Sequence, residues 1–285
     1  MTSPNDLRSR SLQLHTGVTL RCTERPGDGG ETLLLLHGYS DSGPSFVPVL
    51  HALPQDWRIL APDQRGHGDS ERPLDGYAIA DLAADAAALL DAAGVGAATV
   101  VGHSMGSLVA QQLALDHPER VARLVLIGGG AHGATGEVEK MGRDVAALVD
   151  PVPDAFVREF QLGTLAREIP AAFLEEAIAE SRKLPARVWR AIYAGIVAFD
   201  VRERLGRIAC PTLLVWGSCD GIFGRAEQER LLLGIPGAAL YVYENAGHAL
   251  HWEQPERFAR DLREFVAARE PAQPSIVSLR LPPSH

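Results

Sequence analysis

The sequence VVGHSMG at residues 100–106 decides the predicted fold of this chain. A β-branched run at residues 99–101 predicts a strand, and residues 105–116 repeat apolar side chains at helical spacing. A strand that turns directly into a helix at a serine needs small flanking residues, because the turn is tight. Gly102 and Gly106 provide this space. The Ser104 hydroxyl should therefore stand clear of the sheet at a helix N-terminus, where negative charge is favoured.

The rest of the chain alternates strand and helix patterns. A hairpin is predicted at residues 11–15 and 18–23, and apolar runs predict strands at residues 32–36, 58–61, 123–127, 212–216 and 238–243. Helical patterns occupy residues 77–93, 225–233 and 255–268. Continuous apolar runs are typical of strands that are buried on both faces, as in a parallel sheet covered by helices. The alternation therefore predicts the α/β class.

The alternation breaks at residues 131–206, which carry no strand pattern. They contain helical segments with a proline near each expected helix start, at Pro151, Pro153, Pro170 and Pro185. We interpret this segment as a helical cap (lid) inserted after a sheet strand. The predicted organisation is one core domain built from residues 1–130 and 207–270, the cap at 131–206, and a C-terminal tail at 271–285.

Composition excludes several classes of partner. The 285 residues carry a net charge of −9, so no electrostatic footprint for nucleic acid or an anionic membrane is present. The three cysteines are an odd number without a close pair, which favours a reducing compartment. Residues 1–10 are polar, and no uninterrupted apolar stretch is long enough to cross a bilayer. A cytoplasmic location is the expectation.

Two more polar residues follow predicted strands. Asp220 comes soon after the strand at 212–216, and His248 follows the strand that ends at residue 243. The carboxyl ends of parallel strands share one edge of a sheet, so we expect both to converge with Ser104. Asp200 is an alternative acid. His248 and His251 are spaced like a metal pair but lack a third ligand, so no metal is predicted.

These motifs resemble the α/β-hydrolase superfamily over residues 11–268. The resemblance rests on HG at 37–38, DQRGHGDS at 63–70, GHSMG at 102–106, WGSCD at 216–220 and GH at 247–248. The chain order Ser, Asp, His is the order of this fold. The resemblance implies an α/β-hydrolase fold, with a mostly parallel central sheet flanked by helices and a helical cap insertion.

The resemblance also implies catalytic roles. Ser104 would be the nucleophile, His248 the base that takes its proton, and Asp220 the residue that orients the imidazole. The backbone N–H groups of Tyr39 and Met105 would form the oxyanion hole. No cofactor is implied. A serine at the nucleophile position argues against the haloalkane dehalogenase and epoxide hydrolase branches, which use an aspartate there.

The leading hypothesis is a serine hydrolase that cleaves a small, apolar carboxylic ester or lactone through an acyl-enzyme. Three alternatives stay open: a C–C bond hydrolase of β-diketone-like ring-fission products, a cofactor-free perhydrolase or haloperoxidase, and a non-catalytic ligand receptor. The expected partner is a small molecule rather than nucleic acid or membrane, and a homodimer is left open.

Overall fold

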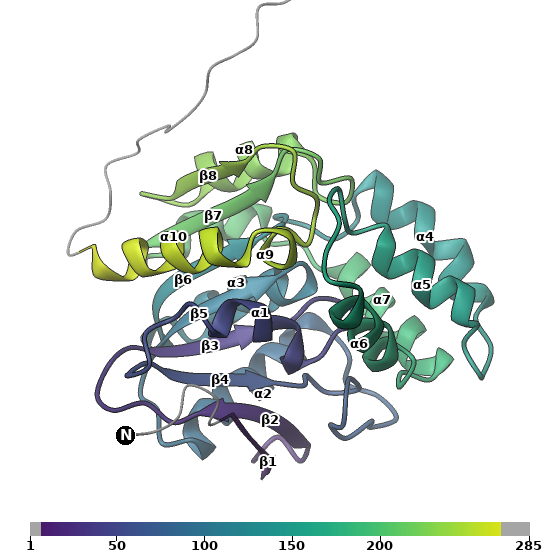
Figure 1. Cartoon of the computed structure of the whole chain (residues 1–285), viewed down its shortest axis with the longest axis horizontal. Coiled ribbons are helices and arrows are strands. Elements are labelled where there is room, and N and C mark those ends of the chain that lie inside the picture. The colour runs from purple at the N-terminus through teal and green to yellow at the C-terminus, as the bar shows by residue number, and fades with distance from the viewer. Residues whose placement is uncertain (1–6, 269–285) are drawn as a thin grey trace, which may run out of the picture.

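An eight-stranded sheet forms the centre of the computed structural model, which describes residues 7–268. Its strands lie in the order β1-β2-β4-β3-β5-β6-β7-β8 (Figure 1). β1 pairs antiparallel with β2 and β2 with β4, whereas the remaining neighbours are parallel. The bounds are β1 (Arg8–Gln13), β2 (Thr19–Arg25), β3 (Thr32–Leu36), β4 (Arg58–Pro62), β5 (Ala98–His103), β6 (Val121–Ile127), β7 (Thr212–Gly217) and β8 (Ala239–Tyr243).

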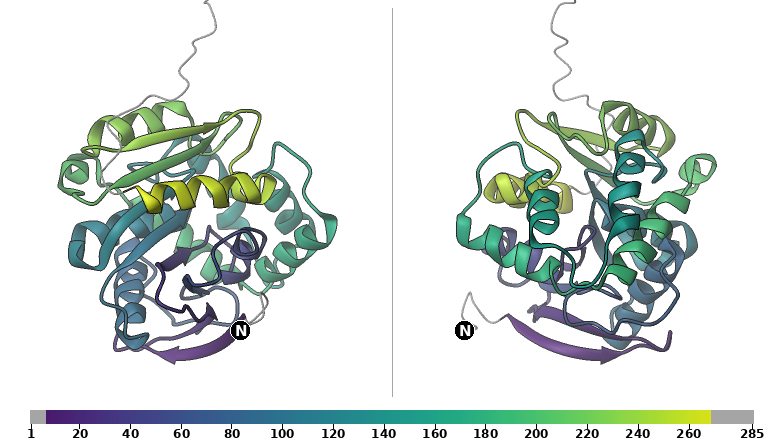
Figure 2. Two further views of the ribbon diagram at one scale, coloured as in Figure 1. Left: turned by 60° about the vertical axis from the view of Figure 1, so that its left-hand side comes forward. Right: turned by 90° about the vertical axis from the view of Figure 1, so that its right-hand side faces the viewer.

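Helices cover both faces of this sheet (Figures 1 and 2). One face carries η1 (Gly43–Phe46), α1 (Val47–Leu50), α9 (Leu250–Glu253) and α10 (Pro255–Ala267). The other face carries α2 (Ile79–Ala92), α3 (Met105–Asp116) and α8 (Arg225–Gly234), with η2 (Pro118–Arg120) after α3. Successive side chains of β3 alternate between the two cores, with Leu33 on one side and Leu34 on the other. This double burial explains the continuous apolar runs.

The predicted α/β fold is confirmed, and the differences lie in short elements. The sequence reading missed the four-residue helices α1 and α9. Elements this short show no helical periodicity, because one turn cannot repeat an apolar face. The predicted tail at 271–285 lies outside the described residues.

The chain between β6 and β7 forms α4 (Gly136–Ala147), α5 (Asp154–Leu162), α6 (Ala171–Ser181), α7 (Ala186–Ala198) and η3 (Arg202–Arg207). Helices α4 to α7 stand at one end of the sheet, at the right of Figure 1. Three of the four prolines directly precede α5, α6 and α7. The fourth, Pro151, lies in the connection between α4 and α5, three residues before α5 begins.

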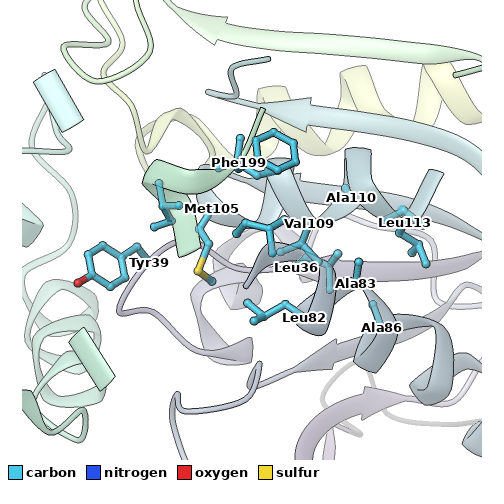
Figure 3. Close-up of a cluster of buried hydrophobic side chains, with 14 of the residues drawn as sticks. Leu36, Tyr39, Leu82, Ala83, Ala86, Met105, Val109, Ala110, Leu113 and Phe199 are labelled. Carbon is cyan, nitrogen blue, oxygen red and sulfur yellow. The ribbon is translucent and has the colours of Figure 1, made fainter. Parts of the chain in front are cut away.

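This helical segment shares its core with the sheet. Trp189 of α7 is fully buried in the same apolar cluster as α2 and α3. The Tyr39 hydroxyl, on the loop after β3, donates a 2.6 Å hydrogen bond to the Trp189 carbonyl. Figure 3 shows Tyr39 on the side of the inserted helices and Met105 at the start of α3. Within residues 7–268, no helix is long and apolar enough to span a bilayer.

Helix α3 lies closer to the sheet than an ordinary side chain would allow. A Cβ atom added at Gly106 would lie 2.0 Å from the Leu36 carbonyl oxygen of β3, and the clash is with backbone that cannot rotate away. Figure 3 shows the result further along the helix, where Val109 packs beside Leu36. Glycine at 106 therefore sets the distance between α3 and β3.

We predict that Gly106→Ala lowers the free energy of unfolding by at least about 3 kcal/mol, because the added methyl group overpacks against fixed backbone. Chemical denaturation measures this loss. Gly96→Ala is the matched control, since a Cβ atom there meets nothing within 4 Å. Equal stability of the two variants would contradict the packing argument.

Candidate active site

Ser104 occupies a strained turn between β5 and α3. Its backbone has φ of +53° and ψ of −118°, a conformation that non-glycine residues rarely adopt. Its N–H donates a 2.9 Å hydrogen bond to the Ile127 carbonyl at the end of β6. A Cβ atom added at Gly102 would lie 2.2 Å from the Gly106 oxygen. The close approach of the backbone therefore requires glycine at both 102 and 106. Ser104 itself stands at the N-terminus of α3.

Asp220 and His248 form a buried pair at the same sheet edge. His248 Nδ1 lies 2.9 Å from Asp220 Oδ2, and both residues are buried. Asp220 Oδ1 also accepts the backbone N–H groups of Ile222 and Phe223, at 2.8 and 3.1 Å. Burial alone would raise the pKa of the Asp220 carboxyl. The charge and hydrogen bond of His248, together with the two backbone donors, hold that pKa below its usual range.

Gly128 provides the space for this pair. A Cβ atom at this position would lie 2.9 Å from His248 Nδ1 and 3.0 Å from Asp220 Oδ2. Its φ of +52° also belongs to the region that favours glycine. The sequence showed that residues 128–130 offer no carboxylate, but gave no sign that the missing side chain makes room for the pair.

His248 lines the same chamber as Ser104, and its second ring nitrogen has no hydrogen-bond partner in the described chain. An ionised Asp220 carboxylate can only accept hydrogen bonds. In the neutral imidazole of His248, Nδ1 therefore carries the proton and Nε2 keeps a lone pair. Nε2 is buried without a hydrogen-bond partner in the described chain. His248 and Ser104 line the same chamber of about 20 Å³, whose other walls are Gly38, Tyr39, Asp41, His103, Phe160, Gln161, Thr164, Ile222 and Trp252. This volume holds about one water molecule.

Two backbone donors flank the serine. Met105 is the first residue of α3, so its N–H has no partner inside the helix. Neither this group nor the N–H of Tyr39 donates a hydrogen bond elsewhere within residues 7–268. Tyr39 lines the chamber beside Ser104. Its ring packs edge-to-face on Trp189, which fixes the loop that presents its N–H.

Asp200 and His251, which the sequence analysis considered as an acid and as a metal ligand, take no part in the hydrogen bond between Asp220 and His248. Asp200 is half exposed, and the hydrogen bond from Arg202 lowers the pKa of its carboxyl to about 2. The Asp200 carboxylate therefore pairs with Arg202 and not with His248. His251 is fully buried against Phe46 and His103, where burial holds its pKa well below the usual range. No group of three or more metal-ligating side chains occurs in the part of the chain that the structure describes.

His103 links the loops around the serine. Its Nε2 lies 3.3 Å from the His248 carbonyl oxygen, and its Nδ1 lies 3.8 Å from Asp41 Oδ2. Burial lowers the pKa of its imidazole, against the opposing effect of Asp41. These contacts give His103 a packing role beside the serine.

Several chamber walls were missed by sequence reasoning, and three of them show why. Phe160 and Gln161 come from α5, and Asp41 comes from the loop after β3. Gln161 Nε2 donates to Asp41 Oδ1 at 2.9 Å and to Ser181 Oγ at 2.7 Å, so it ties α5 to the core and to α6. Phe160 is one of several aromatic residues in the inserted helices, and amphipathic periodicity alone does not say which of them face a site.

Two larger cavities adjoin the chamber. Phe160 and Ile222 also line an outer pocket of about 340 Å³, together with Met141, Phe156 and three carboxylates, Glu137, Asp144 and Glu159. On the other side, Asp41 also lines a pocket of about 200 Å³ between η1 and α6. The serine chamber therefore shares wall residues with a larger pocket on each side.

The α/β-hydrolase fold model matches residues 31–255. The chain belongs to the α/β-hydrolase family. It is accordingly an enzyme, a hydrolase of this fold. RutD from Variovorax paradoxus, a protein provisionally named a carbamate hydrolase, is 34% identical over 253 residues, which cover 85% of this chain and 93% of the relative.

One further relative and two solved structures carry other names. A 2-hydroxy-6-oxononadienedioate/2-hydroxy-6-oxononatrienedioate hydrolase from Burkholderia vietnamiensis is 33% identical and covers 84% of this chain and 88% of its own length. A hydrolase from Pseudomonas aeruginosa has a solved structure with a TM-score of 0.81 and 27% identity, covering 93% of this chain and all of that one. An esterase from Exiguobacterium antarcticum, at 22% identity and a TM-score of 0.84, covers 92% of this chain and all of its own and shows the shared fold.

We predict that Gly128→Ala separates His248 from Asp220, because the added methyl group occupies space that the pair now fills. The strongly hydrogen-bonded Nδ1 proton should lose its downfield NMR resonance at a temperature where the variant is folded. Gly221→Ala, in the Asp220 loop, is the control, since a Cβ atom there meets nothing within 4 Å. An unchanged resonance in Gly128→Ala would overturn this role for Gly128.

Proposed function

We propose that the chain is a serine hydrolase that cleaves a neutral carboxylic ester or lactone through an acyl-enzyme. The observation that carries this proposal is the Asp220–His248 pair, because His248 lines the chamber of Ser104 and its Nε2 has no partner in the described chain. A neutral imidazole at this position is suited to take the serine proton during attack. Ser104, His248 and Asp220 are the proposed nucleophile, base and orienting acid.

The proposed reaction has two halves. The Ser104 oxygen attacks the carbonyl carbon while His248 Nε2 takes its proton, and the imidazolium then gives that proton to the departing alcohol oxygen. Water enters, loses a proton to the same nitrogen and cleaves the acyl ester, which returns the serine. Asp220 stays ionised throughout, and its depressed pKa supports this role, since the carboxylate must stabilise the imidazolium without taking its proton.

The tetrahedral intermediates carry a negative oxygen. The unpartnered N–H groups of Tyr39 and Met105 are the proposed donors for it, and the positive end of α3 adds to the stabilisation. One such donor contributes about 100- to 1,000-fold in rate. The chamber of about 20 Å³ keeps bulk water from the charges that develop.

The charge of the cavities supports a neutral carbonyl substrate. In the described chain, no lysine or arginine lines the chamber or either adjoining pocket, whereas Asp41, Glu137, Asp144, Glu159, Glu176 and Glu180 do. A dicarboxylate, the substrate class in the name of the Burkholderia relative, would be repelled there. The ring-fission alternative is therefore disfavoured, and the same acyl-enzyme chemistry extends to an ester-like carbamate.

The inserted helices are proposed to act as a lid. Phe160 and Ile222 separate the chamber from the outer pocket, and the Phe160 ring packs on Tyr39 and Trp189 at centroid distances of 5.6 and 5.2 Å. A substrate must displace Phe160 to reach Ser104 from this side. Selectivity for the acyl or alcohol part would then reside in the lid rather than in the sheet.

We predict that the purified protein hydrolyses short 4-nitrophenyl esters and that Ser104→Ala lowers kcat by at least about 1,000-fold, because the nucleophile is lost. Release of 4-nitrophenolate measures the rate. Ser107→Ala is the matched control: this hydroxyl donates to the Ser104 carbonyl at 2.6 Å and lies outside the chamber lining. Hydrolysis at an unchanged rate in Ser104→Ala would show that Ser104 is not the nucleophile.

A second comparison distinguishes ester hydrolysis from C–C bond hydrolysis. A dienedioate ring-fission product offered under the same conditions should react far more slowly than the neutral esters. Faster turnover of the dianion would reverse the substrate assignment.

A further inference from the structure

The loop that carries His248 has no regular hydrogen-bonding pattern of its own. It runs from the end of β8 at Tyr243 to the start of α9 at Leu250, and residues 244–249 belong to no helix or strand. Its buried backbone N–H and C=O groups must therefore find partners elsewhere. Those partners decide where the imidazole of His248 stands, because the side chain follows the backbone that bears it.

Two contacts hold the backbone at His248 and at the residue after it. The His248 carbonyl oxygen lies 3.3 Å from His103 Nε2, on the strand that leads to Ser104. The Ala249 N–H donates a 3.0 Å hydrogen bond to the Thr164 carbonyl. Thr164 belongs to residues 163–170 between α5 and α6, which we call the α5–α6 loop. The inserted part of the chain thus contacts the His248 loop directly.

Glu253, the last residue of α9, supplies a third contact. Its carboxylate accepts the N–H of Gly247, at 3.0 Å to Oε2 and 3.2 Å to Oε1. The Oε1 atom also accepts the N–H groups of Ala166 and Arg167, at 2.7 and 3.3 Å. One side chain therefore ties the residue before His248 to the α5–α6 loop.

The two loops pack closely around this carboxylate, and Gly247 leaves the space for it. A Cβ atom added there would lie 2.6 Å from the Ala166 nitrogen, 2.7 Å from the Thr164 carbonyl oxygen and 2.9 Å from Glu253 Oε1. Beside these polar contacts, apolar side chains from both sides form one small cluster: Ala249 and Trp252 with Leu165, Ile169, Phe173 and Ala177. The carboxylate thus sits at a packed junction between the inserted chain and the His248 loop.

We propose that Glu253 is a positioning residue for the base and that it holds His248 in place through the Gly247 N–H. This role rests on the proposed function, in which His248 Nε2 takes the Ser104 proton. Hydrogen bonds to a carboxylate are roughly twice as strong as those between neutral groups. Such placement matters, since a displacement of about 1 Å at a reacting group can lower a rate about 100-fold.

The same carboxylate joins the proposed lid to the base. Glu253 Oε1 accepts N–H groups from the α5–α6 loop and from the His248 loop at once. A displacement of the α5–α6 loop would remove two of the three donors that fix the carboxylate, and with them the support of the Gly247 N–H. His248 is therefore held firmly only while this part of the lid is seated.

Two conservative substitutions separate the reach of the Glu253 side chain from its charge. Glu253→Gln loses the charge but can keep an oxygen at the place of Oε1, within hydrogen-bond distance of all three N–H groups. Glu253→Asp keeps the charge but withdraws both oxygens by one methylene. We expect Glu253→Asp to lower kcat for 4-nitrophenyl acetate about 10- to 100-fold with KM changed less than about twofold. Glu253→Gln should lose less than about fivefold.

Arg187→Ala is the matched control. Arg187 Nη1 and Nη2 donate to the Pro73 and Arg72 carbonyls, each at 2.8 Å, so this side chain joins the inserted helix α7 to the core away from His248. Its removal should leave kcat unchanged. An equal loss in Arg187→Ala would assign the effect to a loosened lid in general and contradict the proposal. Glu253→Asp with the activity of Glu253→Gln, or with more, would also contradict it.

An NMR measurement tests the positioning role without any substrate. In Glu253→Asp, the Nδ1 proton of His248 should lose its downfield resonance through faster exchange with water, at a temperature where the variant is folded. Glu253→Gln and Arg187→Ala should keep this resonance. An unchanged resonance in Glu253→Asp would overturn the role of Glu253, even if Ser104-dependent ester hydrolysis is observed. The expected change in a protein that hydrolyses no ester would support this role and remove only the proposed function.

Discussion

The close approach of α3 to β3 is the constraint on which the site depends. At Gly106, the helix backbone comes so near the Leu36 carbonyl that no side chain fits between them. This approach forces the chain at Ser104 into its positive-φ turn and brings the start of α3 beside the loop after β3. We propose that the N–H groups of Met105 and Tyr39 can act on the same oxygen because these two backbones are so close. The strain at Ser104 is thus held by packing around the turn.

Glycine has the same effect at a second position, where the absence of a side chain leaves room for two others. Gly128 leaves space for His248 and Asp220, and the pair is buried so that its hydrogen bond is protected from water. Burial also closes the chamber to about 20 Å³, with Phe160 as part of the wall. A chamber this small needs an entrance that opens before a substrate can reach Ser104, which agrees with the role in substrate selection that we propose for the inserted helices.

The sequence predicted the parts of this structure that strong local patterns specify. Buried strands such as β3, and the glycine-flanked turn at Ser104, follow from apolar runs and backbone sterics, and the order of motifs placed Asp220 and His248 at one edge. The wall residues Gln161 and Asp41 were missed because their contacts join segments about 120 positions apart. The part played by Gly128 was missed for a related reason, since it depends on the absence of a side chain beside two distant residues.

The most direct test of the central claim is the site of covalent labelling by a serine-directed fluorophosphonate, mapped by mass spectrometry. Attack by an activated serine leaves a stable phosphonyl group on the nucleophile. The account predicts one adduct per chain, on the peptide that contains Ser104, and none in Ser104→Ala. An adduct on a different residue, or an unlabelled protein with native fold, would contradict it.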